Sequence, residues 1–451
     1  MRFHWLWGLL LVTLGASVWP PERLAAAAGR PEVPAAPATL AACIDRALER
    51  SPRLALAHAA ARAADTGVDL ARSAGGLHAA LSGEVRGTTP TPLVQIPGQE
   101  PREVIPALDA SLGLAIEVPL DVGRRLRSER RAAQAGADAA WARYEQARDQ
   151  LVFEVVRAYY GVLQADAFRD ATAAAVDAAE ESRRVTRARV AAGMANDLES
   201  QRADTALAKA REQLALAESR AAEARAALAT VIGMPGAPVG ELQIVFLEPD
   251  RIPDPEESIA RAQAERPELA AALADLRQAA SRLRAADAAD RPAWALSGGV
   301  KAQRASLIRV PFAATIGLGF TWPFGDHGRA DALVDQAEAS RDGARSAVAD
   351  TAAAIELQVQ QSVLAIADAR SRIDSAMMVR TEAEQALAEA EAAERRGASL
   401  PMGTLRARAS LAEAVALERA SRYALSVAYA AWARSTGATA EVFLTAGPPE
   451  G

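Results

Sequence analysis

An internal duplication with a period of about 205 to 215 residues constrains the fold of this sequence more than any other feature. The segment Ile44–Leu54 (IDRALERSPRL) recurs as Ile259–Leu269 (IARAQAERPEL). The segment VPLDVGR, which begins at Val118, recurs with one inserted residue as WPFGDHGR, which begins at Trp322. Two glycine pairs, each 204 positions apart, are Gly193 with Gly397 and Gly233 with Gly437. Landmarks in the same order at nearly the same offset indicate two copies of one structural unit.

The landmarks divide the chain into two repeats with short flanking segments. A Pro/Gly-rich connector separates the copies, because proline and glycine end regular structure. The predicted segments are an N-terminal signal (1–28), a Pro/Ala-rich linker (29–39), the first repeat (40–233), the connector (234–257), the second repeat (258–437) and a C-terminal tail (438–451).

Each repeat is predicted to contain a helix, a pair of strands and a long helical hairpin. The helices are expected at about 40–74 and 256–290, where apolar residues recur with the helical period. The hairpins are expected at 124–233 and 329–437, each with a turn at a glycine. Half the residues are hydrophobic but only 4% are aromatic, and alanine supplies most of the difference. Such a composition favours long helices packed closely side by side.

Four stretches change from the helical period to strict alternation of apolar and other residues, at about 77–87, 108–118, 293–303 and 311–322. In the last stretch the apolar set is Phe312, Ile316, Leu318, Phe320 and Trp322. Nine to eleven residues is the length that a tilted strand needs to cross a bilayer. A half-buried sheet of a soluble protein would give the same alternation, so the strands alone leave both interpretations open.

The composition argues against several classes of function. The single cysteine and four scattered histidines exclude a Cys-rich metal site, and no cofactor is expected. A net charge of −6 argues against a nucleic-acid partner. We find no Ser/His/Asp arrangement, phosphate loop or metal cluster, so an enzyme is not expected.

The first 28 residues have the pattern of a secretory signal, with a basic start, an apolar stretch and a small-residue cleavage region. No later run of about 18 apolar residues follows, so no helical membrane span is expected. The sequence LAAC before Ile44 resembles a lipoprotein processing box. Because it lies about 25 residues beyond the apolar stretch and begins a helix, we expect Cys43 to be a core cysteine rather than a lipidation site.

Four membrane strands cannot close a barrel in one chain. An open sheet edge in lipid leaves backbone N–H and C=O groups unpaired, at several kcal/mol each. If the strands lie in a membrane, the protein must therefore oligomerise. Small residues between the apolar ones would then face an open, hydrated bore, and they include Ser111, Gly113, Gly317 and Gly319.

Taken together, the signal, the two repeats and the Pro-x-x-x-Gly-Arg strand exits resemble the TolC-type outer-membrane efflux proteins (outer membrane factors) over residues 40–445. The resemblance implies a mainly α fold with a membrane β-barrel segment, in which a homotrimer forms a twelve-stranded barrel and an α-helical periplasmic tunnel. It implies an outer-membrane channel of a tripartite efflux or secretion system in a Gram-negative-type cell. The expected partners are a periplasmic adaptor, an inner-membrane pump of the RND or ABC type, and outer-membrane lipid.

The resemblance also assigns the two hairpin turns. Gly193 and Gly397 would be the periplasmic tips that contact the adaptor. Asp197 and Glu199 would contribute to a periplasmic aperture, where family members often carry acidic residues. The second turn departs from that pattern because it has Arg406, so a mixed ring with interhelical salt bridges is an alternative to an acidic, cation-selective one. Ordinary solvated helix ends would give the same charges.

Two other functions remain as alternatives: a soluble periplasmic coiled-coil scaffold, or a periplasmic adaptor. A scaffold would explain the helices but not the four alternating strands, and an adaptor usually has one hairpin rather than two. The cargo stays open between drugs, metal ions and polypeptides, because a tube lined by small and charged residues has no specificity pocket. The sequence also does not identify the pump and the adaptor.

Overall fold

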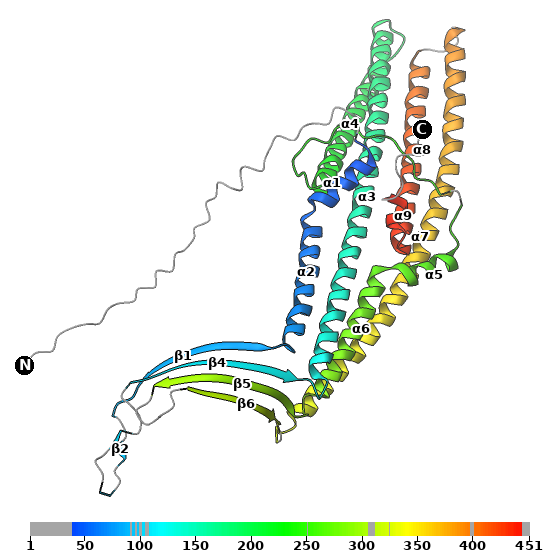
Figure 1. The fold of residues 1–451 in the computed structure, drawn as a ribbon. Helices are drawn as coiled ribbons and strands as arrows, with labels where there is room; N and C mark the ends of the chain where they lie inside the picture. Colours follow the sequence, from blue (N-terminus) through cyan, green and yellow to red (C-terminus); the bar gives the residue numbers. More distant parts are fainter. Residues whose placement is uncertain are drawn as a thin grey trace, which may run out of the picture.

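The computed structural model describes residues 38–90, 93–94, 97–98, 102–103, 108–249, 251–304, 312–323, 325–396 and 401–443. Long helices form an elongated bundle, and a curved sheet extends from one end of it (Figure 1). The predicted signal at 1–28 and the predicted tip glycine Gly397 lie outside the described residues.

The order of elements confirms the predicted repeat of helix, strand pair and long hairpin. The first repeat contains α1 (Leu40–Arg50), α2 (Pro52–Ser73), β1 (His78–Gly87), β4 (Leu108–Leu120), α3 (Arg125–Ala191) and α4 (Asp197–Val231). The second contains α5 (Pro255–Glu265), α6 (Pro267–Ala286), β5 (Ala293–Arg304), β6 (Phe312–Thr321), α7 (Arg329–Arg395) and α8 (Pro401–Thr436). Three elements were not predicted: β2 (Leu93–Val94) and β3 (Arg102–Glu103), which pair with each other, and α9 (Thr439–Phe443).

The prediction of one continuous helix at the start of each repeat was wrong. The first is divided into α1 and α2 at Ser51, and the second into α5 and α6 at Arg266. Both residues precede a proline and are extended, with ψ of 118° and 123°. Proline has no N–H for the helix and disfavours helical geometry in the residue before it. The apolar periodicity continues across each proline, which is why it concealed the break.

Each long helix begins at a turn in which an aspartate caps the helix. The Asp121 carboxylate accepts a hydrogen bond from the Leu126 N–H at 2.9 Å, and Asp326 accepts one from the Ala330 N–H at 2.8 Å. The residue before each helix is left-handed, with φ of 63° at Arg124 and 82° at Gly328. A carboxylate here satisfies N–H groups that have no partner within the helix. The repeated VPLDVGR and WPFGDHGR segments are therefore strand-to-helix turns.

The helix α3 lies at the centre of the bundle. It packs against α2 and α6 along the half nearer the sheet, and against α4 and α8 along the other half (Figure 1). The helix α7 packs against α6 and α8. One flank of the chain is thus formed by α2 and α4, and the opposite flank by α7. Within the described parts of the chain, no helix combines the length and hydropathy that a membrane span requires.

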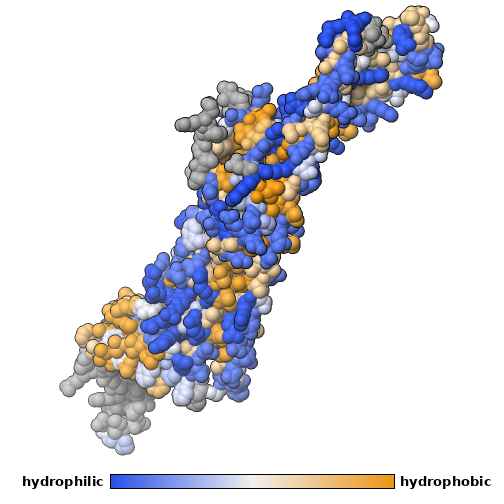
Figure 2. Space-filling model, turned by 90° about the vertical axis from the view of Figure 1, so that its right-hand side faces the viewer, coloured by the Kyte–Doolittle hydropathy of each residue, from blue (hydrophilic) through white to orange (hydrophobic). Residues whose placement is uncertain are grey.

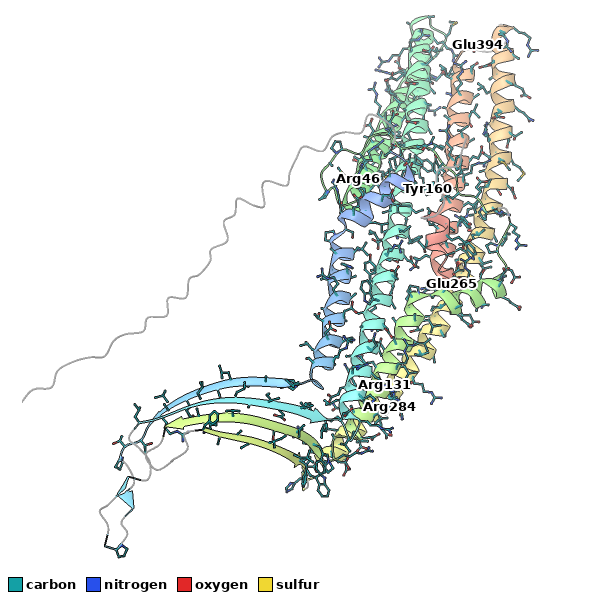
Figure 3. The ribbon with its side chains drawn as sticks, in the orientation of Figure 1. Arg46, Arg131, Tyr160, Glu265, Arg284 and Glu394 are labelled. Carbon is teal, nitrogen blue, oxygen red and sulfur yellow. The ribbon has the colours of Figure 1, made fainter. Side chains whose placement is uncertain are left out.

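The main hydrophobic core lies midway along the bundle and joins the two repeats. Tyr159 and Tyr160 of α3 are fully buried there, together with Tyr423 of α8 (Figure 3, where Tyr160 is labelled). Cys43 of α1 is 2% exposed in the same core. The Tyr159 hydroxyl lies 3.0 Å from the carbonyl oxygen of Ala38. These contacts attach the N-terminal helix to both hairpins.

The end of each hairpin packs against the end of the first short helix of its own repeat. Gly233 has φ of 74°, and a Cβ atom added there would lie 2.8 Å from the Cβ atom of Arg50. Gly437 has φ of 81°, and its added Cβ atom would lie 3.0 Å from that of Glu265. Both positions need glycine for the left-handed backbone and for the close approach. The two repeats therefore share this contact as well as the sequence pattern.

A buried charged cluster forms where α6 begins. Arg266 is 3% exposed, and its guanidinium donates to Glu268 at 2.7 Å, to Gln358 at 3.1 Å and to the carbonyl oxygen of Ser435 at 3.1 Å. Burial, followed by repulsion from neighbouring glutamates, raises the pKa of Asp149 in this region to about 6. The cluster joins α3, α6, α7 and α8.

Candidate channel wall and periplasmic tips

The four strands form one antiparallel sheet in the order β1-β4-β5-β6. Residues that pair across neighbouring strands lie on the same face of a sheet. Ile116 of β4 and Ile316 of β6 both pair with Gly298 of β5, so the register places the two isoleucines on one face. The apolar face carries Ala79, Leu81, Val85, Leu112, Leu114, Ile116, Val118, Trp294, Leu296, Val300, Phe312, Ile316, Leu318 and Phe320. The opposite, polar face carries His78, Ser82, Glu84, Ser111, Gly113, Glu117, Ser297, Lys301, Thr315, Gly317 and Gly319.

Among the elements that the structure describes, none covers either face of this sheet. Every residue of β1 and of β6 is exposed, and Ile316 is 84% exposed. Figure 2 shows hydrophobic residues gathered over the sheet end of the molecule. Large apolar side chains exposed in such number mark a surface that contacts lipid or another protein. The predicted lipid-facing residues of β6 lie together on this apolar face, and Trp322 follows directly after the strand.

Aromatic rings gather where the sheet meets the helices. The Trp294 and Phe320 rings lie 5.0 Å apart across β5 and β6. The Trp322 Nε1–H donates a hydrogen bond to the carbonyl oxygen of Asp290 at 2.9 Å, just beyond the end of the sheet. Tryptophan with one apolar and one hydrogen-bonded end is typical of the boundary between lipid and water. These rings therefore indicate the level at which the apolar face ends.

The first hairpin turn is built by residues with identifiable roles. Gly193 has φ of 74° and ends α3, and the Asn196 side chain caps α4 by accepting from the Glu199 N–H at 3.0 Å. Asp197 and Glu199 lie in the first turn of α4, where the helix dipole favours acidic residues. The Glu199 carboxylate lies 4.0 Å from the guanidinium of Arg189. At this tip Asp197 is exposed and Glu199 is half-buried.

The structure does not pair Asp197 with Arg406 within one chain. Arg406 is exposed on α8 and lines a groove of about 450 Å³ between α3, α4 and α8, with Phe168 and Glu413. Glu413 lies two turns further along the same helix. A mixed ring would therefore have to form between subunits.

Ion pairs that the sequence did not predict link the two helices of each hairpin. Asp204 of α4 accepts from Arg183 at 2.6 Å and from Arg187 at 3.1 Å, and these hydrogen bonds hold the pKa of the Asp204 carboxyl below its usual value. In the second hairpin, Arg408 pairs with Glu391 at 3.0 Å. Equal spacing from the turn was the available signal, because Asp204 and Arg183 are almost equidistant from Gly193. Exposed pairs of this kind orient the helices more than they stabilise them.

Among the residues that the structure describes, no three His, Cys, Asp or Glu side chains are grouped as a metal site.

Comparison with known proteins places these features in context. The family model for "outer membrane efflux protein" matches residues 43–234 and 258–438. Among solved structures, the CmeC outer membrane channel of Campylobacter jejuni is similar with a TM-score of 0.77 and 19% identity, covering 88% of this chain and 85% of that one. The outer membrane protein VceC of Vibrio cholerae has a TM-score of 0.76 and 20% identity, with 88% and 96% covered. The MtrE outer membrane channel of Neisseria gonorrhoeae has a TM-score of 0.72 and 22% identity, with 88% of each chain covered. A search of curated proteins by sequence found no significant relative.

Proposed function

The chain belongs to the outer membrane efflux protein family, and from that premise we propose that it forms the outer-membrane channel of a tripartite efflux or secretion system. Membership of this family favours the channel over the two alternatives, a soluble scaffold and a periplasmic adaptor. The observation that carries the proposal is the sheet, which has one apolar and one polar face. Among the described residues both faces are uncovered, and the outer strands β1 and β6 each have one edge without a partner strand.

Closure of the sheet requires other copies of the chain. In lipid, each unpaired backbone group at the edges of β1 and β6 would cost several kcal/mol. Pairing β6 of one subunit with β1 of the next removes both edges, and three chains give about twelve strands. Barrel diameter grows with strand number, and eight strands enclose an interior that side chains just fill, so about twelve strands are wide enough for a bore. Because α7 forms one flank of the chain and α2 and α4 form the other, the same rotation would bring α7 of one subunit beside α2 and α4 of the next and so extend the barrel as a helical tunnel.

The tips supply the proposed contacts with other proteins. A periplasmic adaptor would bind the hairpin ends near Gly193 and Gly397, and through it an inner-membrane pump would deliver the cargo. Asp197, Glu199 and Arg406 are proposed to line the aperture there, since the two acids lie in the first turn of α4, where Asp197 is exposed, and Arg406 is exposed near the start of α8.

Conductance and extraction test the proposal together. The protein purified in detergent and added to a planar lipid bilayer should give discrete conductance steps. In cells it should be recovered from the outer-membrane fraction only with detergent. Recovery in a detergent-free periplasmic extract, or a reconstituted protein without conductance, would contradict the channel.

A further inference from the structure

Lys301 lies on the polar face of the sheet, and none of the described residues neutralises its charge. Its backbone pairs with Gly113 of β4 on one side and with Ala313 of β6 on the other, so no large neighbour covers it. The side chain is exposed. Lys301 is one of only two lysines in the sequence, the other being Lys209.

The other charged residues on this face stand apart from Lys301. Glu84 is engaged by Arg86 at 2.5 Å, and the backbone of Arg86 pairs with Asp109. Glu117 lies four residues from the level of Lys301 along β4, which is about 13 Å. Within the described part of the chain, no carboxylate forms an ion pair with the Lys301 ammonium. The positive charge is therefore directed at whatever fills the space next to the polar face.

The neighbouring side chains on the polar face are small and neutral. They include Ser82, which lies opposite Gly113, and Ser297 and Thr315 of the next strands. A cationic group among glycines and hydroxyls attracts anions without forming a tight pocket for one ligand. Such a site affects the permeation of a charge class rather than the binding of one compound.

We propose that Lys301 makes this section of the channel favour anionic permeants, as a ring of three ammonium groups in the bore. This inference rests on the proposed function, because the ring exists only in the closed trimeric barrel. Three charges about 7 Å from the axis of a twelve-stranded barrel raise the local anion concentration about fourfold in 0.1 M salt. In 1 M salt the same ring raises it only about 1.3-fold.

A thiol reporter beside the ring tests the local charge. Thr315 lies on the polar face of β6, two residues from the partner of Lys301, and Cys43 is buried and does not compete for the reagent. The variant Thr315→Cys, purified and inserted in lipid nanodiscs, is treated with anionic and with cationic water-soluble thiosulfonates. Adding Lys301→Gln should slow the anionic reagent about fourfold in 0.1 M salt and speed the cationic one comparably. The difference should almost vanish in 1 M salt.

The charge-conserving variant Lys301→Arg is the matched control, and it should retain the reagent preference. Unchanged rates in the Lys301→Gln background, or a thiol at position 315 that neither reagent modifies, would overturn the proposal. In planar bilayers, Lys301→Glu should lower the chloride over potassium permeability ratio relative to Lys301→Arg. If the unaltered chain conducts but Lys301→Glu and Lys301→Arg have the same permeability ratio, the proposed lysine ring is contradicted and the proposed channel is not. If the unaltered chain does not conduct, the channel itself is wrong and the ring falls with it.

Discussion

Exchanging adjacent residues of β6 for arginine tests which face of the sheet contacts lipid. Ile316 lies at the middle of the strand on the apolar face and is 84% exposed in the single chain, whereas Thr315 lies on the polar face. Arginine at the bilayer midplane costs about 2–4 kcal/mol on the lipid side of a barrel. Because three subunits carry the change, Ile316→Arg should destabilise the inserted assembly by about 6–12 kcal/mol. Thr315→Arg places the same side chain in water and should cost little.

The assay compares both variants with the unaltered protein at equal expression. The amount in the outer-membrane fraction and the fraction that migrates as an oligomer in mild detergent should fall severely for Ile316→Arg and only slightly for Thr315→Arg. The two variants share strand, charge and side-chain size, so general disruption of β6 would affect them alike. Equal assembly of both, or a greater loss for Thr315→Arg, would refute the assignment of the two faces.

Three predictions concern the helical part. Gly233→Ala should lower the thermal unfolding temperature more than Gly193→Ala does. Both glycines have φ of 74°, but only the Cβ atom added at Gly233 would have a neighbouring atom within 4 Å. Equal losses of unfolding temperature would mean that this close approach does not affect stability. Asp149→Asn should stabilise the protein near pH 7, and this gain in stability should shrink toward pH 4. The pKa of the Asp149 carboxyl is raised to about 6 in the folded state, so between about pH 4 and 6 the folded state holds a proton that the unfolded state releases. The stability of the unaltered protein therefore falls as the pH rises through this interval, whereas the neutral asparagine avoids the loss. A pH-independent difference in unfolding temperature would contradict that pKa. Arg266→Ala should destabilise the fold by about 3–5 kcal/mol in denaturant unfolding, because it removes a buried charge and leaves its partners unpaired, and a loss below about 1 kcal/mol would contradict a structural role for the cluster.

The sequence was sufficient for the repeat and for the faces of the strands. A two-residue period assigns each side chain to one side once a strand exists, so the apolar set on β6 was predictable from its alternation. The breaks at Pro52 and Pro267 were also marked in the sequence, but the helical period continued across them. Because Pro52 and Pro267 occupy the same position in the two repeats, they indicate a break in each helix more strongly than the apolar period indicates a continuous one.

Other features depend on contacts between distant segments. The isolation of Lys301 follows from the strand register, which sets it opposite Gly113 and which no local pattern specifies. The pairing of Asp204 with Arg183 depends on how two helices align after their turn. Many exposed arginines and acids on the hairpins satisfy the same spacing, so the sequence alone could not select the pairs that form.

The number of chains in the lipid-inserted assembly tests the central claim most directly, since that claim is that the open edges of β1 and β6 are closed by neighbouring copies. Native mass spectrometry of the protein extracted from the outer membrane, or held in lipid nanodiscs, measures this number. The account predicts three chains in every conducting particle. A single chain that is stable in lipid and conducts would contradict it.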